Sequence, residues 1–265
     1  MATDPPVASP PTSGVVSVHD LWVGYDHTPA LEALSFDLPA GSLVGVAGPN
    51  GSGKSTLLKT LLGLLKPWRG RIELFGRPVD GTRPRMGYAP QAEQADWGFP
   101  ATVGDVVMMG RYGRIGLFRR PGVADREAVA RALAQVGIES LAGRQIGELS
   151  GGQQRRMLVA RALAQEADLI LLDEPMVGLD ATTQHDLLAL FETLRNQGKT
   201  LLVATHDLSC VAACFDLTLL LNRRLVAFGP PGEIFTPEIL SEAYDEHLLL
   251  LPTEGGVYVG HHAHG

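Results

Sequence analysis

The stretch Leu43-Val-Gly-Val-Ala-Gly-Pro-Asn-Gly-Ser-Gly-Lys-Ser-Thr56 decides the fold of this chain. Its first residues, 43–47, carry no polar side chain, which favours a strand buried on both faces. The remainder fits the pattern G-x-x-x-x-G-K-[ST], in which glycines let backbone N–H groups converge on phosphate oxygens at a helix start. The motif predicts a phosphate loop made of Gly48, Pro49, Asn50, Gly51, Ser52, Gly53, Lys54, Ser55 and Thr56.

Two side chains of this loop have predicted roles in holding a nucleotide. The Lys54 ammonium would reach the β- and γ-phosphates, and the Ser55 hydroxyl would bind Mg²⁺. The context supports the motif, because an apolar strand precedes it and a helical pattern over residues 54–65 follows it. By itself, the motif indicates a nucleotide and leaves the reaction open.

Strands and helices alternate after the phosphate loop. Apolar runs at residues 86–89, 169–172 and 200–204 predict further strands, and residues 182–196 predict a helix between the last two. This alternation predicts an α/β fold with a mostly parallel sheet. Partly alternating runs at residues 15–18 and 33–38 predict an attached antiparallel β subdomain. Helical patterns from about residue 101 to residue 164 predict an inserted helical subdomain.

Composition excludes several classes of protein. With Lys and Arg at 22 against Asp and Glu at 29, the net charge is −7, which argues against a nucleic-acid binder. Two cysteines provide no disulfide framework, which favours a cytosolic chain. No apolar run approaches the length of about 18 residues that a membrane span needs. We therefore expect any membrane role to come through a partner.

The two ends of the chain differ in composition from its middle. Residues 1–14 are rich in Pro and Ser and predict a disordered leader, and residues 15–251 predict a folded domain. Residues 252–265 predict a flexible tail that carries His261, His262 and His264. Clustered histidines can bind Zn²⁺ or Mn²⁺, and a solvated tail without a binding role is the simpler interpretation.

Two acidic residues end a predicted strand in Leu169-Ile-Leu-Leu-Asp-Glu174. Ligands of α/β sheets gather at the carboxyl ends of strands, where the phosphate loop also lies. Asp173 is therefore a candidate Mg²⁺ ligand, and Glu174 is a candidate base that orients and polarises an attacking water. Solvated acidic residues are the alternative interpretation, and the neighbouring phosphate loop favours the functional one.

A third motif, Leu149-Ser-Gly-Gly-Gln153, lies before a predicted helix. Its glycines and hydroxyl suit anion binding, although a helix cap by Ser150 is the simpler interpretation of the pentapeptide alone. Together with the phosphate loop and residues 169–174, it resembles the ATP-binding cassette ATPases, the nucleotide-binding subunits of membrane transporters. The resemblance covers about residues 15 to 235 and implies a P-loop NTPase (RecA-like) core.

The resemblance implies a site shared between two chains. Two copies would face each other head to tail, each holding ATP in its own phosphate loop. The residues that would contact the γ-phosphate from the opposite chain are Ser150, Gly151, Gly152 and Gln153. Asp180 would lie at the interface, in a loop Met176-Val-Gly-Leu-Asp180 that departs from the commoner Ser-Ala-Leu-Asp but keeps the aspartate.

The resemblance also assigns three isolated residues. Tyr25 would stack on adenine, Gln91 would touch Mg²⁺ and the attacking water, and His206 would contact the γ-phosphate. Without the resemblance, these would be interpreted as a strand tyrosine, a surface glutamine and the cap of the next helix. Glu174, Lys54 and His206 are the expected catalytic residues of ATP hydrolysis.

The implied partners place the chain at the cytoplasmic face of the membrane. An integral membrane permease would dock after Gln91, where Trp97 and Phe99 form a candidate apolar anchor. A metal-binding protein that delivers the substrate would be an indirect partner, and no nucleic acid is expected.

Several segments are similar to the ATPases of manganese and zinc uptake systems, namely residues 96–103, 107–113, 117–121, 175–181 and 219–225. We therefore expect import of Mn²⁺ or Zn²⁺, with an iron-chelate importer as the nearest alternative. A soluble cassette ATPase acting on DNA or ribosomes is disfavoured by the single phosphate loop and the lack of sustained heptads. A small-molecule kinase would need neither residues 149–153 nor Glu174.

Overall fold

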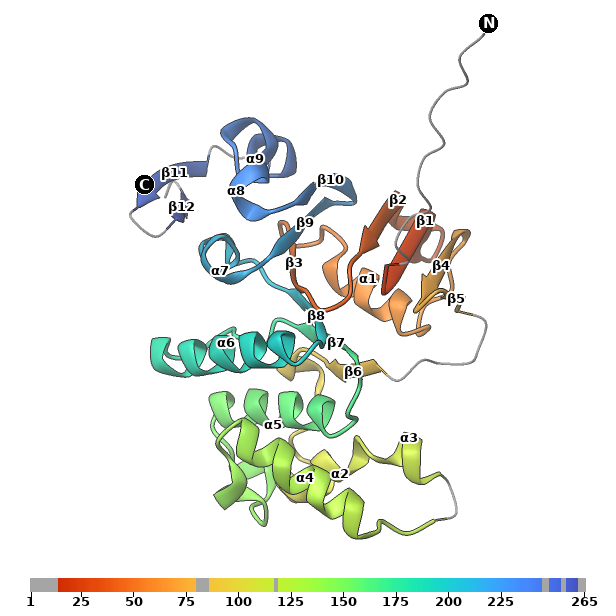
Figure 1. Cartoon of the computed structure of the whole chain (residues 1–265), viewed down its shortest axis with the longest axis vertical. Coiled ribbons are helices and arrows are strands. Elements are labelled where there is room, and N and C mark those ends of the chain that lie inside the picture. The colour runs from red at the N-terminus through yellow and green to blue at the C-terminus, as the bar shows by residue number, and fades with distance from the viewer. Residues whose placement is uncertain (1–13, 80–85, 117–118, 245–247, 254–255, 262–265) are drawn as a thin grey trace, which may run out of the picture.

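The computed structural model of the chain describes residues 14–79, 86–116, 119–244, 248–253 and 256–261. Its centre is a six-stranded sheet with the strand order β10-β9-β3-β8-β7-β6 (Figure 1). Neighbouring strands from β9 to β6 run parallel, and β10 joins the edge antiparallel, which confirms the predicted mostly parallel sheet. The strands are β3 (Leu43–Ala47), β6 (Met86–Ala89), β7 (Leu169–Asp173), β8 (Thr200–Ala204), β9 (Leu217–Asn222) and β10 (Arg224–Gly229).

The central strands are buried on both faces because apolar residues continue along them. Every residue of β3, β7 and β8 is buried. Alternate residues serve two cores, so that Val44 and Val46 belong to one hydrophobic cluster and Leu43 and Ala47 to the other. Because β8 lies between β3 and β7, the carboxyl ends of these parallel strands share one edge of the sheet.

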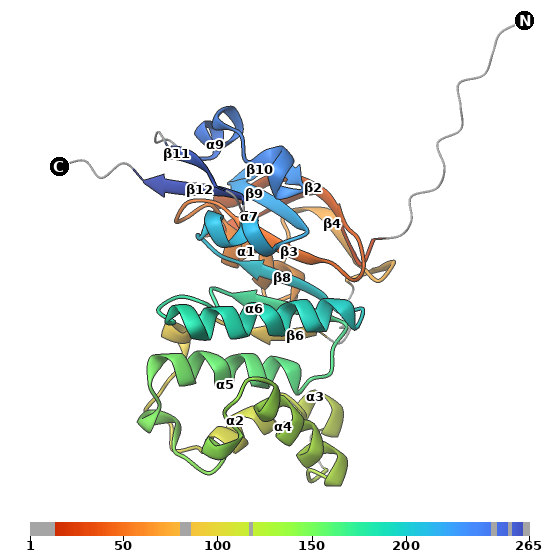
Figure 2. The same cartoon turned by 60° about the vertical axis from the view of Figure 1, so that its left-hand side comes forward.

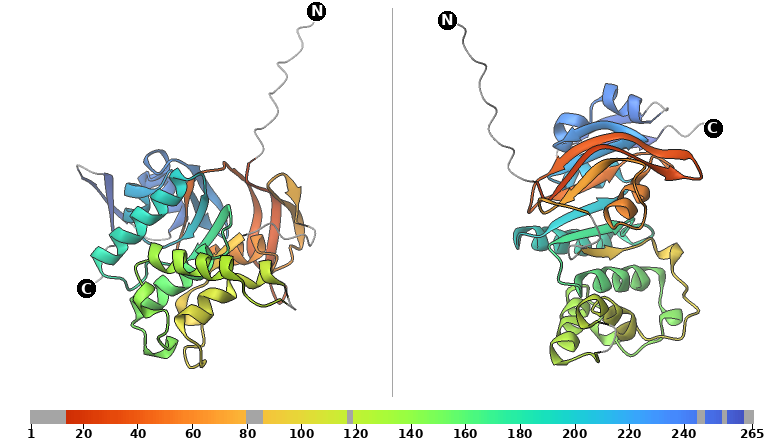
Figure 3. Two further views of the ribbon diagram at one scale, coloured as in Figure 1. Left: turned by 60° about the horizontal axis from the view of Figure 1, so that its bottom comes forward. Right: turned by 90° about the vertical axis from the view of Figure 1, so that its right-hand side faces the viewer.

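A second, antiparallel sheet covers one face of the first and confirms the predicted β subdomain. Its strand order is β2-β1-β4-β5. Helix α1 (Lys54–Leu61) lies between the two sheets (Figures 1 and 3), with Leu57, Leu58 and Leu61 buried. The strands are β1 (Val16–Tyr25), β2 (Thr28–Leu38), β4 (Arg69–Leu74) and β5 (Arg77–Pro78).

Helix α1 ends earlier than the sequence predicts, at Leu61 rather than at residue 65. Gly63 follows with φ at 69°, a left-handed conformation that glycine adopts without strain. The Gly63 N–H donates to the Thr60 carbonyl at 2.9 Å, which satisfies one of the last carbonyls of the helix. The glycine therefore ends the helix before Pro67 is reached.

The helical subdomain lies on the other side of the six-stranded sheet (Figures 1 and 2). Helix α6 (Ala181–Asn196) lies close to β8 and β3, and α5 (Gly151–Leu163) lies close to β6 and β7, so both helices cover this face of the sheet. The inserted helical subdomain that the sequence predicts is confirmed. Its helices and 3-10 turns are η1 (Ala92–Gln94), α2 (Val103–Met109), α3 (Tyr112–Ile115), α4 (Val123–Gln135), η2 (Glu139–Leu141), η3 (Ile146–Glu148) and α5 (Gly151–Leu163).

The C-terminal segment contains further helices and a hairpin. Helix α7 (Leu208–Cys214) precedes β9, and α8 (Pro231–Ile234) and α9 (Pro237–Ala243) follow β10. Strand β11 (Leu248–Thr253) then pairs antiparallel with β12 (Gly256–His261), whose backbone runs close to α7. Residues 252, 253 and 256–261 of the predicted tail thus lie in a paired hairpin, and the flexibility of the tail stays a prediction. Leucines at 248–251 and the run Val257-Tyr-Val259 favour strands more strongly than the nearby glycines and histidines oppose them.

Two sequence predictions fall outside the described residues. Residues 1–13 of the predicted leader lie outside the described residues, and its last residue, Gly14, lies within them. His262 and His264 of the histidine cluster follow β12 and also lie outside the described residues. Among the helices that the structure describes, none combines the length and the apolar character needed to cross a membrane.

Candidate functional site

The phosphate loop connects β3 to α1 at the carboxyl end of a central strand. Lys54 is the first residue of α1, and its Nζ donates hydrogen bonds to the carbonyls of Gly48 (2.8 Å) and Pro49 (2.9 Å). Burial lowers the pKa of Lys54, whereas the charges of Glu174 and Asp173 raise it. The ammonium is thus held inside the loop, with two carboxylates close enough to stabilise its charge.

Glycine is required at two positions of this loop. Gly48 has φ at 148°, and a Cβ there would lie 2.1 Å from the carbonyl oxygen of Leu221. Gly53, the N-cap of α1, has φ at 101°, and a Cβ there would lie 2.3 Å from Leu31 Cδ2. A larger residue at either position would push the loop away from β9 or β2. The glycines therefore let the loop lie tightly against its neighbours at the start of α1, where anions bind.

Ser55 and Asp173 join the loop to the end of β7. The Ser55 hydroxyl donates to Asp173 Oδ1 at 3.0 Å, whereas Asp173 Oδ2 is buried without a hydrogen-bond partner among the described residues. Burial raises the pKa of Asp173, and the hydrogen bond from Ser55 opposes that rise. A hydroxyl and a carboxylate with an unsatisfied oxygen form a set of hard oxygen ligands that fits Mg²⁺.

Glu174 follows β7 with its backbone in the left-handed region, at φ 52°. Its N–H donates to the Ala204 carbonyl at 3.0 Å, which holds this conformation against the end of β8. The Glu174 side chain is 11% exposed, and its Oε2 lies 3.0 Å from Nδ1 of His206, which is 59% exposed. Asp207, rather than His206, caps α7 by accepting from the Cys210 N–H. The interpretation of His206 as a helix cap is therefore wrong.

A cavity of about 330 Å³ lies over the phosphate loop and collects residues from several elements. Tyr25 from the end of β1, Gln91 from the start of η1 and Glu174 line it together with loop residues 50–56. Ala30 of β2 also lines it, a residue that sequence reasoning missed. The pairing of β1 with β2 offers a signal for Ala30. Thr28 pairs with Tyr25, and Ala30 lies two positions further along the same strand.

Residues 150–153 and Asp180 are not among the residues that line this cavity in the described structure. Ser150 Oγ accepts from the Gln153 N–H (3.4 Å), and Gln153 Oε1 accepts from the Ser150 N–H (3.0 Å), a reciprocal cap of α5. Asp180 caps α6 by accepting from the Thr183 N–H at 3.0 Å. The interpretation of Ser150 as a helix cap is confirmed, and Ser150 and Gly151 are exposed in their own chain.

Tyr244, directly after α9, is a further residue near the loop that sequence reasoning missed. Its hydroxyl is buried and makes no hydrogen bond with the residues that the structure describes. Burial raises the pKa of Tyr244, and the Gly48 amide lies close enough to oppose part of that rise. No motif marks this tyrosine, since only the folding of the C-terminal segment brings it behind the phosphate loop.

Comparisons with known proteins agree with this geometry. A family model described as ABC transporter matches residues 31–177. The manganese transport system ATP-binding protein MntB of Bacillus subtilis is 47% identical over 236 residues, 89% of this chain and 94% of that protein. The zinc transport system ATP-binding protein TroB of Treponema pallidum is 46% identical over 233 residues, 88% of each chain. The solved inward-facing structure of a protein assigned as a metal-chelate type ABC transporter has a TM-score of 0.79 at 34% identity, over 94% of this chain and 96% of that chain.

The α/β core and the phosphate loop define the class of protein, a P-loop ATPase, and confirm the predicted P-loop NTPase core. The match over residues 31–177 and the identity to full-length relatives show that the chain belongs to the ABC transporter family. Its activity is ATP hydrolysis as the nucleotide-binding subunit of a membrane transporter.

Proposed function

We propose that this chain powers the import of Mn²⁺ or Zn²⁺ through a membrane permease, from the cytoplasmic face of the membrane. The observation that carries the proposal is the 47% identity to the manganese protein MntB over most of both chains. Similarity to the zinc protein TroB supports the same class of substrate. An iron-chelate importer is the second candidate, favoured by the structural similarity to the metal-chelate type transporter.

Metal uptake in cells tests the choice of substrate. Deleting the gene should abolish transporter-dependent uptake of radioactive Mn²⁺ or Zn²⁺, because an ABC importer moves no substrate without ATP hydrolysis. The wild-type chain should restore uptake, and the Glu174→Gln variant should not. If the wild-type chain instead restores uptake of an iron chelate and of neither metal ion, the second candidate is the correct function.

In the proposed site, residues 48–56 bind the phosphates of ATP and Tyr25 stacks on the adenine. Ser55, Asp173 and Gln91 hold Mg²⁺, which neutralises phosphate charge when bound. The unsatisfied Oδ2 of Asp173 and its hydrogen bond to Ser55 support this ligand set.

Hydrolysis in this proposal needs a base and a charged environment beside the phosphate loop. Glu174 accepts a proton from the attacking water, because its carboxylate lines the same cavity as Lys54. His206 contacts the γ-phosphate and orients Glu174, as their separation of 3.0 Å allows. Lys54 stabilises the charge that develops on the phosphate oxygens.

The site is completed by a second copy of the chain, in a head-to-tail dimer. Ser150, Gly151, Gly152 and Gln153 act on the γ-phosphate held by the partner, and Asp180 lies at the interface. Two observations support this arrangement: these residues do not line their own chain's cavity in the described structure, and the start of α5 is exposed.

The permease docks on the helical subdomain, beside the segment that follows Gln91. Trp97 is tied into the fold, since its Nε1 donates to the Ala92 carbonyl at 3.0 Å and its ring packs on the core. Phe99 is 52% exposed, and Met109 and Tyr112 are further exposed apolar residues of the same subdomain. Phe99 is therefore the better anchor of the two aromatic residues, because it has surface to bury.

Replacing Phe99 by alanine is expected to reduce the permease that copurifies with the chain by about tenfold or more, as for an aromatic interface anchor. ATP binding should stay unchanged, because Phe99 does not line the cavity over the phosphate loop. Phe75→Ala is the matched control, since Phe75 is an exposed phenylalanine beside the antiparallel sheet. Normal copurification of the Phe99→Ala variant would remove Phe99 from the docking surface.

A further inference from the structure

The two segments that would meet a second chain also touch each other within one chain. A Cβ placed on Gly152, at the start of α5, would lie 3.4 Å from Leu179 Cδ2. A Cβ on Gly178 would lie 3.5 Å from Nη1 of Arg155, the fifth residue of α5. The loop before Asp180 is therefore in contact with the first turns of α5.

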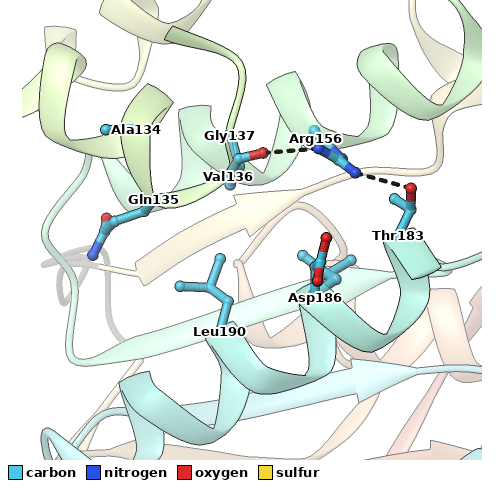
Figure 4. A pocket seen from close by; sticks show the side chains of 9 residues that line it. Ala134, Gln135, Val136, Gly137, Arg156, Thr183, Asp186 and Leu190 are labelled. Atoms are coloured by element: carbon cyan, nitrogen blue, oxygen red, sulfur yellow. Dashed lines mark hydrogen bonds between the residues drawn. The ribbon is translucent and has the colours of Figure 1, made fainter.

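Further along the same helices, apolar packing leaves a gap. A cavity of about 230 Å³ separates the end of α4, α5 and α6, lined on the α6 side by Thr183, Asp186, Leu187 and Leu190 (Figure 4). A gap of this kind removes contacts from its lining, so packing alone fixes the relative position of α5 and α6 weakly there. Elsewhere the two helices share one apolar core, to which Met157 and Phe191 belong, so at this gap polar contacts add to that packing.

Arg156 bridges this gap from α5. Its Nη2 donates to Thr183 Oγ1 at 2.9 Å, and its Nη1 donates to the Val136 carbonyl at 3.4 Å, as the dashed lines in Figure 4 show. Val136 directly follows α4 as its C-cap, where a positive charge complements the free carbonyls of the helix. Within the described part of the chain, the bond to Thr183 is the single hydrogen bond that joins α5 to α6.

Thr183 connects Arg156 to Asp180 through hydrogen bonds. The hydroxyl that accepts from Arg156 donates to Asp180 Oδ2 at 2.7 Å, and the Thr183 N–H donates to Asp180 Oδ1 at 3.0 Å. These hydrogen bonds hold the pKa of Asp180 below its ordinary value, so the carboxylate stays charged. Because a donor that is itself polarised by a cation binds a carboxylate more strongly, the three groups form a cooperative chain.

We propose that Arg156 and Thr183 are positioning residues that hold Asp180 at a fixed position relative to residues 150–153. A second copy of the chain would then meet one rigid surface. Arg156 lies on the helix that Ser150 caps, and Thr183 lies on the helix that Asp180 caps. The hydrogen bond between them therefore links the two capped helices, in addition to the contacts of Gly152 and Gly178. This inference rests on the dimer described under the proposed function.

The test is ATP-driven dimerisation of variants that carry Glu174→Gln, which slows hydrolysis. Thr183→Val keeps the shape of the side chain and removes the hydroxyl. It should raise the MgATP concentration needed for half-dimerisation by about tenfold, because a lost hydrogen bond to charged groups has an effect of this size. Arg156→Met should have the same effect, and Thr183→Ser should restore dimerisation. Binding of MgATP to the dilute monomer, measured with a fluorescent ATP analogue, should not change.

Thr193→Val is the matched control, because Thr193 lies on the same helix and, among the described residues, its hydroxyl bonds only the Ala189 carbonyl. If the Thr183→Val and Arg156→Met variants dimerise like their parent, or if Thr183→Ser fails to restore dimerisation, the positioning role is wrong. If the Glu174→Gln parent itself stays monomeric with MgATP, the proposed dimer is wrong and the inference falls with it. The two failures are thus distinguishable.

Discussion

Replacing Glu174 by glutamine is expected to slow ATP hydrolysis by about 10²–10⁴-fold, the range for loss of a positioned general base. The amide keeps the size of the side chain but cannot accept the proton of the attacking water. The groups expected to hold the nucleotide are untouched, because Lys54 bonds its own loop and Ser55 bonds Asp173. Phosphate release by the purified chain under saturating MgATP measures the rate.

The same variant is expected to accumulate as a dimer with ATP bound. Gel filtration should show a shift to the dimer with MgATP and not with MgADP, while the wild type stays mainly monomeric. Adding Ser150→Arg should abolish the shift, because a long side chain at the exposed start of α5 would block the contact with the partner's phosphate. Hydrolysis by Glu174→Gln at the wild-type rate would mean that another group is the base.

Lys54→Met is expected to weaken MgATP binding by at least about 100-fold, as for removal of one partner of a buried charged contact. Lys54 is 7% exposed, and methionine matches its unbranched stem without supplying hydrogen-bond donors. In the proposed site, no other lysine or arginine of the same chain lines the cavity among the described residues. Titration with a fluorescent ATP analogue gives the affinity directly.

The matched control for this prediction is Lys66→Met, which makes the same change on an exposed lysine after α1. Both variants should show a cooperative thermal transition, so that a loss of affinity reports on the site rather than on unfolding. Unchanged affinity in the Lys54→Met variant would contradict the assignment of the loop as the phosphate site.

The parts of the fold that the sequence predicts well are those decided by local pattern. Strands β3, β6 and β8 occupy the predicted residues, because each is a short run of mostly apolar residues. The same holds for the phosphate loop and Asp173, whose chemistry depends on residues at fixed spacing. Tyr25 and Gln91 follow from the family resemblance, since nothing local distinguishes a tyrosine at the end of a strand.

Features that depend on packing between distant segments could not be predicted in this way. The β11–β12 hairpin was missed because glycines and histidines obscure strand-forming residues in the sequence. The bond between Arg156 and Thr183 depends on how α5 lies against α6, which no spacing reveals. Tyr244 reaches the phosphate loop only because α9 folds back over the sheet edge formed by β9 and β10.

The two hydrogen bonds from Lys54 to its own loop bear on the free energy of nucleotide binding and release. A phosphate that takes these donors leaves the carbonyls of Gly48 and Pro49 to find other partners. Nucleotide entry is then an exchange of hydrogen bonds, and the net gain per bond is much smaller than its strength in isolation. In the proposed site, the loop can regain its internal bonds when ADP departs, which offsets part of the cost of releasing the product.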